Sequence, residues 1–198
     1  PALSDGGPIP HGWHGAFFPA LHRLSELRAD GQFGGGGQVP VPLPRRRLIG
    51  SRSVYHDALR IGDRITQTLE IADVVVRDRG TGPTVLVIQR ESISSSRGLA
   101  VVEERDVLYF GMEGTGTLDA PPDPLASPAW RRTFESNPVM IWRLCAVRYN
   151  SHRIHFDREY TTKVEGYPGI VVPVSLVSQL MVEMCRVEEP KRPLAFHG

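Results

Sequence analysis

The chain has 198 residues, of which 40% are hydrophobic, and a formal net charge of +1 at pH 7. This length allows one large domain or two small ones, and the hydrophobic content is enough for a buried core. The near-zero net charge argues against a general nucleic-acid or membrane-surface binder. Cys145 and Cys185 lie in no CxxC or metal-ligand spacing, which indicates reduced thiols rather than a disulfide scaffold.

No apolar run approaches the ~20 residues that cross a bilayer, and the opening segment PALSDGGPIP lacks the features of a signal peptide. We therefore expect a cytoplasmic protein. Two arginine clusters, Arg45–Arg47 and Arg131–Arg132, are too short for a nucleic-acid footprint. They predict a solvated loop face. The alternative is attraction of an anionic substrate, such as the phosphates of coenzyme A, which guanidinium groups bind through paired hydrogen bonds.

Residues 1–50 are rich in Pro and Gly. The run Gly34–Gly37 is not followed by Lys-Ser/Thr, so it gives little support to a phosphate-binding loop. Residues 39–44 alternate with proline and are expected to be extended. Between residues 13 and 27, the apolar spacing permits a short amphipathic helix after Pro19.

Residues 51–111 have a β pattern. Long runs rich in β-branched and apolar residues predict strands over 64–78, 84–92 and 99–110. The turn signal Gly80-Thr-Gly-Pro83 separates the first two strands. Short turns between long strands predict an antiparallel meander.

Residues 112–138 are rich in Gly, Pro and Asp and predict a linker between a first unit, 1–111, and a second unit, 139–198. The second unit is expected to open with a β-like segment at 139–149. One or two helical turns follow at 157–164, with Asp157 as the cap.

The best helix in the chain is predicted at residues 175–188, with Ser175 as its cap. Its apolar residues recur at helical spacing, which predicts packing in the core rather than a cofactor site. This stripe consists of Leu176, Val177, Leu180, Met181 and Met184.

Four polar residues lie close together in the sequence just before the segment 157–164: Asn150, His152, His155 and Asp157. The three-residue spacing of His152 and His155 would suit two metal ligands on a helical turn. No third ligand has convincing spacing, so we expect no metal. Surface histidines beside a helix cap are the alternative interpretation.

The stretch 149–176, YNSHRIHFDREYTTKVEGYPGIVVPVSL, resembles the active-site segment of MaoC-like hotdog hydratases and dehydratases. It is most similar to the branch related to 3-methylfumaryl-CoA (mesaconyl-C4-CoA) hydratases. Short motifs of the first half match this branch in the same order. They are Gly12-Trp13-His14, Phe17-Phe18-Pro19, Ser25-Glu26-Leu27, Pro40-Val-Pro-Leu-Pro-Arg-Arg46 and Leu59-Arg-Ile-Gly-Asp63.

This resemblance implies an α+β protein with a double-hotdog arrangement, in which each antiparallel sheet wraps a long helix. It also implies reversible addition of water to a 2-enoyl thioester of coenzyme A or an acyl-carrier protein, with no cofactor. Asn150 and His155 match the family positions that hold the water, and His155 would carry the proton. Asp157 and His152 would orient His155 or cap the next helix, and for Asp157 the cap is favoured.

Two departures from the family pattern are visible. After Gly169 the family continues to a His-Gly pair, whose backbone N–H polarises the thioester carbonyl, whereas this chain has Pro173-Val174. Gly169 and Val174 are therefore the expected substrate-binding positions, with Val174 offering an N–H beside a bulkier side chain. The second sheet also looks incomplete, so we expect association with a like or unlike chain.

Three functions follow from these features. The first is an enoyl-thioester hydratase or dehydratase. The second is a catalytically degenerate hotdog subunit that binds a ligand or stabilises an active partner. The third is a thioesterase or cyclase on the same scaffold, because a fold does not fix its chemistry.

Overall fold

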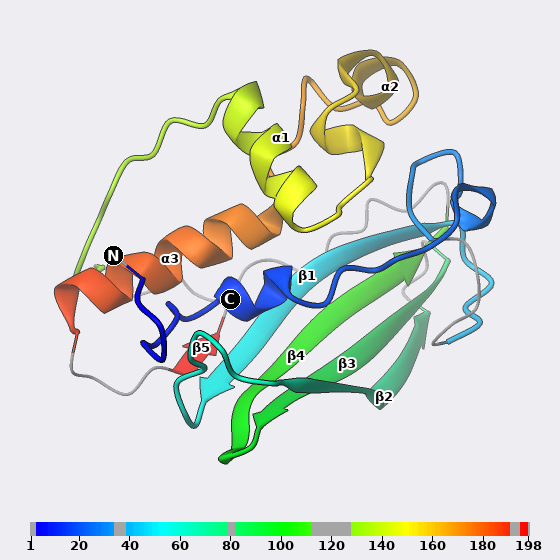
Figure 1. The fold of residues 1–198 in the computed structure, drawn as a ribbon. Helices are drawn as coiled ribbons and strands as arrows, with labels where there is room; N and C mark the ends of the chain where they lie inside the picture. Colours follow the sequence, from blue (N-terminus) through cyan, green and yellow to red (C-terminus); the bar gives the residue numbers. More distant parts are fainter. Residues whose placement is uncertain (1–2, 34–38, 79–81, 112–127, 191–194, 198) are drawn as a thin grey trace.

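The computed structural model describes residues 3–33, 39–78, 82–111, 128–190 and 195–197. Within them, one antiparallel sheet of five strands runs in the order β2-β3-β4-β1-β5. The α-helices gather at one side of this curved sheet (Figure 1). The strands are β1 (Arg45–Tyr55), β2 (Thr66–Asp78), β3 (Pro83–Ser95), β4 (Gly98–Phe110) and β5 (Ala195–His197).

The predicted meander is confirmed. β2 pairs with β3 along its whole length, and β3 pairs with β4 in the same antiparallel manner. The tight turn between β3 and β4 contains Gly98 at φ 117°, a left-handed conformation that a glycine adopts without steric cost. The turn residues 79–81 lie outside the described residues.

The strand β1 begins earlier than the β pattern indicated. It starts at Arg45 and pairs with β4 from Arg45↔Phe110 to Tyr55↔Val101. The prediction of a solvated loop at Arg45–Arg47 is therefore wrong. Three consecutive arginines do not resemble a buried strand, but β4 supplies a long partner edge that pairs with their backbone.

The helix α1 (Pro138–Val147) replaces the β-like segment expected at 139–149. A short apolar run does not by itself distinguish a strand from a buried helix. The capping residues at its start explain why this segment forms a helix. The Asn137 side chain accepts a hydrogen bond from the N–H of Met140 at 3.0 Å, and Pro138 occupies the first turn, where its missing N–H has no cost.

Two further helices confirm their predicted positions. Asp157 caps α2 (Arg158–Lys163) by accepting a hydrogen bond from the N–H of Tyr160 at 3.0 Å. The helix α3 (Val174–Glu188) begins one residue before the predicted helix, so Pro173 is its cap residue and the prediction of Ser175 as the cap is wrong.

The predicted apolar stripe of α3 is only partly buried. Leu176 is buried, and Leu180 and Met184 are half-buried, but Val177 and Met181 are exposed. The prediction that the whole stripe packs in the core is therefore wrong. These residues span a wide arc of the helix surface, and the described part of the chain covers only one side of it.

No α-helix forms between residues 13 and 27. Two short 3-10 helices occur instead, η1 (Trp13–Ala16) and η2 (Leu24–Glu26). Leu21 and Leu24 are exposed rather than packed, so an α-helix here would have no buried apolar face to stabilise it. The apolar spacing was therefore not a core-facing stripe.

A buried apolar cluster of Leu59, Ile93, Ala100 and Val101 anchors one end of the sheet. Charged side chains continue along the face of β4 that carries Val101, because alternate residues of a strand share a face. Glu103 accepts a hydrogen bond from His14 Nε2 at 3.1 Å and another from Arg105. Glu91, also buried, pairs with Arg105 at 2.8 Å.

The C-terminal part of the chain contacts the N-terminal part directly. β5 adds to the edge of the sheet by pairing with residues 52–54 of β1. The division into units 1–111 and 139–198 stays a prediction. Much of the predicted linker, residues 112–127, lies outside the described residues, as does the glycine run 34–37.

Candidate active site

The segment that carries the polar constellation is folded tightly against the end of α1. Tyr149 has φ 52°, an unusual left-handed conformation for a residue other than glycine, and it reverses the chain after the helix. The N–H of Asn150 then donates to the carbonyl of Cys145 at 2.8 Å. The 3-10 helix η3 (Arg153–His155) follows at once. This reversal turns the residues from Asn150 to His155 back across α1.

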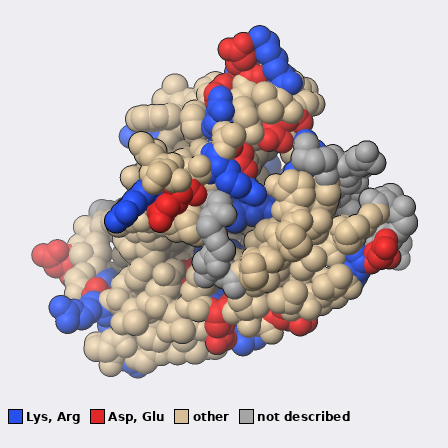
Figure 2. All heavy atoms as spheres, turned by 90° about the vertical axis from the view of Figure 1, so that its right-hand side faces the viewer, with Lys and Arg blue, Asp and Glu red and all other residues tan. Residues whose placement is uncertain are grey.

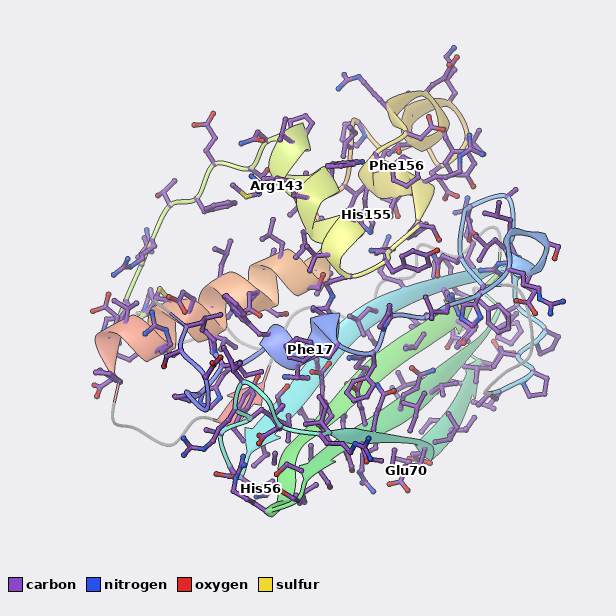
Figure 3. All side chains as sticks on the ribbon, in the orientation of Figure 1. Phe17, His56, Glu70, Arg143, His155 and Phe156 are labelled. Carbon is purple, nitrogen blue, oxygen red and sulfur yellow. The ribbon has the colours of Figure 1, made fainter. Side chains whose placement is uncertain are left out.

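His155 is buried at the end of η3, in the helical part of the molecule and away from Glu70 and His56 (Figure 3). Its Nδ1 lies 2.8 Å from the carbonyl oxygen of Val171. A carbonyl only accepts, so Nδ1 carries the hydrogen and the lone pair of the neutral ring is on Nε2. The N–H of Val171 in turn donates to the carbonyl of Ile154 at 2.9 Å, which fixes both segments together.

Burial lowers the pKa of His155 below 6.5, and the hydrogen bond to Val171 opposes this effect. The imidazole is therefore neutral near pH 7. A neutral ring whose Nδ1–H is already bonded can accept a proton at Nε2, which is the requirement for a general base.

His152 lies next to His155, with the ring centroids 5.3 Å apart and the planes at 86°. Burial, followed by the charge of His155, lowers the pKa of His152 to about 4. Within the described part of the chain, no group of three His, Cys, Asp or Glu side chains is arranged to hold a metal ion.

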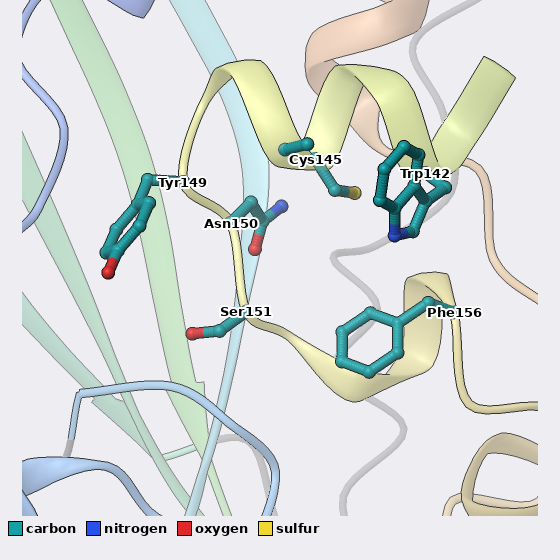
Figure 4. A pocket seen from close by; sticks show the side chains of 7 residues that line it. Trp142, Cys145, Tyr149, Asn150, Ser151 and Phe156 are labelled. Atoms are coloured by element: carbon teal, nitrogen blue, oxygen red, sulfur yellow. The ribbon is translucent and has the colours of Figure 1, made fainter. Parts of the chain in front are cut away.

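Asn150 lines an open pocket of about 220 Å³ between α1 and η3. Figure 4 shows Trp142 and Phe156 on opposite sides of this pocket, with Asn150 near Cys145. The Asn150 Oδ1 accepts a hydrogen bond from the N–H of His152 at 3.1 Å, while the amide nitrogen faces no described acceptor. The lining residues are Trp142, Cys145, Ala146, Tyr149, Asn150, Ser151 and Phe156.

The structure thus places Asn150 and His155 on the same short segment but does not bring both into this pocket. His155 is not among the residues that line the pocket, and it lies beside His152. The pocket is mainly apolar, which suits an acyl chain better than a charged group.

Both carboxylate oxygens of Asp157 have structural partners. One accepts from the N–H of Tyr160, and the other accepts from the Arg153 guanidinium at 2.7 Å. These interactions lower the pKa of Asp157. The geometry is that of a helix cap with an ion pair, so Asp157 does not orient His155.

Of the two expected substrate-binding positions, Val174 is the first residue of α3 and is half-exposed. The side chain of the cap residue Pro173 gives no hydrogen bond to the first-turn N–H groups. Gly169 is not required by sterics, because a Cβ there would meet only Arg158 Nη1 at an ordinary 3.8 Å.

Residues 28–33 form an N-terminal arm that contacts the site segment, and no sequence motif predicts this contact. The N–H of Arg153 donates to the carbonyl of Asp30 at 2.9 Å. The Ser151 hydroxyl donates to the carbonyl of Gly31, and Gln32 contacts His152 at 3.0 Å. These partners are about 120 residues apart, so no local pattern reveals them. Only the positive φ of Gly31 could have been expected from the sequence, because a glycine is the residue that adopts it most readily.

The arginine clusters are largely engaged with protein groups. Arg46 donates to Gln32, Arg47 donates to the Tyr167 hydroxyl at 3.1 Å, and Arg132 pairs with Glu188. On the face shown in Figure 2, basic and acidic side chains lie next to one another without an extended patch of one sign. None of the described helices has the length and apolar character needed to span a membrane.

Comparison with known proteins gives consistent relatives. The chain is 34% identical over 192 residues to mesaconyl-C(4)-CoA hydratase of Chloroflexus aurantiacus, with 94% of this chain and 67% of the relative covered. It is 25% identical to the mitochondrial hydroxyacyl-thioester dehydratase type 2 of Schizosaccharomyces pombe, with 91% and 68% covered. The chain thus spans about two thirds of the length of these curated relatives.

Solved structures support the fold. A MaoC-like dehydratase superposes with a TM-score of 0.61 at 12% identity, covering 88% of this chain and 62% of that protein. The HtdX protein of Mycobacterium tuberculosis gives 0.60 at 16% identity, covering 96% and 71%. The α+β hotdog fold expected from the sequence is thereby confirmed. The profile of the hydroxyacyl-thioester dehydratase type 2 family matches residues 12–197, and the chain belongs to this family.

Proposed function

We propose that this protein adds water to, or removes water from, the carbon–carbon double bond of a 2-enoyl thioester. The observation that carries the proposal is His155, a buried neutral imidazole whose Nδ1–H is held by Val171, so that Nε2 is left as a base. It occupies the signature segment of a family whose named relatives are hydratases and dehydratases.

In the hydration direction, Nε2 of His155 removes a proton from water as the water oxygen bonds to the β-carbon of the enoyl group. The electron pair of the double bond moves through the α-carbon to the thioester oxygen, giving an enolate. The proton on Nε2 then passes to the α-carbon, which restores the carbonyl. Atoms and charge balance, and dehydration is the reverse sequence.

Asn150 contributes by position rather than by proton transfer. Its Oδ1 is engaged with the N–H of His152, and its amide nitrogen can donate to the water oxygen. The apolar pocket between Trp142 and Phe156 would take the acyl chain.

The N–H of Val174, at the start of α3, would stabilise the enolate oxygen. A backbone N–H at a helix start favours negative charge whatever side chain follows it. The Pro173-Val174 pair therefore keeps this donor, and the valine side chain beside it is half-exposed.

The test is loss of the conjugated-thioester absorbance when the full chain is incubated with crotonyl-CoA and mesaconyl-type CoA esters. We expect turnover by the wild type and a loss of about 10²–10⁴-fold in His155→Gln. His56→Gln is the matched control, because His56 is an exposed histidine far from the site. Equal rates in the two variants would contradict the role of His155.

A non-catalytic subunit is the second candidate, and two observations favour it: His155 does not line the open pocket, and the large side chains of α1 are exposed. Val139, Trp142 and Val147 are each at least 60% exposed. Binding of crotonyl-CoA without turnover, together with self-association in sedimentation velocity, would support it. Release of free thiol from acyl-CoA would instead indicate the thioesterase alternative.

We further propose that the substrate is a coenzyme A or acyl-carrier thioester, that no cofactor takes part, and that the chain associates with a like or unlike hotdog chain in the cytoplasm. The named relative from Chloroflexus aurantiacus supports a CoA thioester, whereas the relative from Schizosaccharomyces pombe is mitochondrial. Turnover of crotonyl-CoA and of crotonyl-loaded acyl-carrier protein, compared at equal concentration, distinguishes the two carriers.

A further inference from the structure

Three side chains from distant parts of the sequence form a hydrogen-bonded chain that ends beside His155. Arg46 Nε, on β1, donates to Gln32 Oε1 at 2.5 Å. Gln32 Nε2, on the N-terminal arm, lies 3.0 Å from Nε2 of His152. The His152 ring then stands nearly perpendicular to the His155 ring at a centroid distance of 5.3 Å.

The chemistry of these groups fixes the direction of every bond in the chain. A guanidinium only donates, so the group of Gln32 that faces Arg46 is its carbonyl oxygen, and its NH2 faces His152. Nε2 of His152 therefore accepts, and the ring hydrogen is on Nδ1. If Nε2 became protonated, it would face the NH2 as a second donor. Rotation of the amide would relieve that clash only by turning the NH2 towards Arg46.

The groups around His152 also oppose its protonation. It faces Asp30, Arg28 and Gln32 from the N-terminal arm, Arg46 from β1, and His155 from its own segment. Of these, only Asp30 favours a positive charge on His152. The Asp30 carboxylate already binds Arg28 at 3.2 Å and the N–H of Gln32 at 2.8 Å.

We propose that Gln32 and Arg46 are positioning residues of the catalytic site, which hold His152 as a neutral acceptor so that His152 fixes the orientation of the His155 ring. The inference rests on the proposed function in one respect, the role of His155 as the base. A neutral neighbour also keeps a positive charge away from Nε2 of His155, where it would oppose uptake of a proton from water.

Alternative explanations are weaker. A purely structural tie between the arm and the site segment is already supplied by backbone and hydroxyl contacts, from Arg153 to Asp30 and from Ser151 to Gly31. The Gln32–His152 bond adds an imidazole-specific constraint that those contacts do not give. This hydrogen bond constrains the imidazole ring of His152 rather than the backbone.

The first experiment reads the ring nitrogens directly. Long-range ¹⁵N–¹H spectra of the full chain at pH 7 should show wild-type His152 with hydrogen on Nδ1 and a bare Nε2. In Gln32→Glu, the introduced carboxylate can still accept from Arg46 and becomes an acceptor facing His152. We expect the hydrogen to appear on Nε2 of His152 in this variant. A bare Nε2 in both proteins, or a protonated Nε2 in the wild type, would overturn the inference.

The second experiment separates positioning from folding. Gln32→Met keeps the length of the side chain but removes both hydrogen bonds, and it should lower kcat about tenfold or more with KM changed less than about twofold. Gln179→Met is the matched control, because Gln179 also ties the N-terminal region to the C-terminal region, by donating to the carbonyl of His11 at 3.0 Å. It should leave kcat within about twofold of the wild-type value. Equal kcat values in the two variants would refute the role of Gln32.

The two experiments also distinguish this inference from the proposed function. Absence of enoyl-thioester turnover in the wild type contradicts the proposed function alone, because the spectra report on His152 without any substrate. An unchanged Nε2 of His152 in Gln32→Glu contradicts the positioning chain alone, whatever the activity.

Discussion

Glu103 is the residue whose replacement should destabilise the fold most clearly. Its carboxylate is buried between His14 and Arg105 on β4. Burial alone would raise the pKa of Glu103, but the hydrogen bond from His14 and the charge of Arg105 outweigh this and lower it from 4.5 to about 2. Each pKa unit corresponds to about 1.4 kcal/mol, so the folded state gains about 3 kcal/mol from the charged form.

We therefore expect Glu103→Gln to lower the free energy of unfolding by about 3 kcal/mol at pH 7, because Arg105 loses one of its two carboxylate partners. The effect has a defined pH dependence. A depressed carboxyl pKa stabilises the fold above pH 4.5, and this stability is lost as the pH falls towards 2. The difference between the wild type and the variant should shrink to about 1 kcal/mol at pH 3.

Urea unfolding followed by far-ultraviolet circular dichroism at both pH values measures these differences. Glu104→Gln is the control, because Glu104 is the next residue of the same strand and forms partly exposed ion pairs with Arg52 and Arg90. Such pairs contribute less than about 1 kcal/mol. If Glu103→Gln destabilises the protein no more than Glu104→Gln at pH 7, the reasoning about the buried network is wrong.

Three further outcomes are expected. As the pH is lowered, the kcat for hydration should fall with an apparent pKa below 6.5, because burial favours the neutral form of His155. An acidic limb of the pH–rate profile with an apparent pKa above 6.5 would contradict this. Asp157→Ala should cost about 1 kcal/mol in thermal unfolding through loss of the α2 cap, without moving that limb. Gly31→Ala should lower the free energy of unfolding by more than about 2 kcal/mol, because Gly31 has a positive φ and the added Cβ would meet the Ser151 carbonyl. Gly82→Ala should lower it less, because Gly82 has a similar φ but open space around the added Cβ.

Local sequence predicted the elements whose signals are local. The strands β2, β3 and β4 are rich in β-branched and apolar residues, and the Asp157 cap precedes α2 at the expected position. The α1 segment was misassigned because an apolar run of this length suits a strand or a helix equally. The pair Asn137-Pro138 just before it is a helix-start signal that could have decided between them.

The sequence by itself determined the family, through the ordered motifs and the segment from Asn150 to His155, and it determined most of the sheet. The tertiary structure alone decided what surrounds the two histidines. Gln32 contacts His152 across 120 residues of sequence and is itself held by Arg46, and the carbonyl of Val171 selects the hydrogen-bearing nitrogen of His155. Neither contact leaves a local pattern, because tautomer and ring orientation depend on partners that only the folded chain brings within hydrogen-bonding distance.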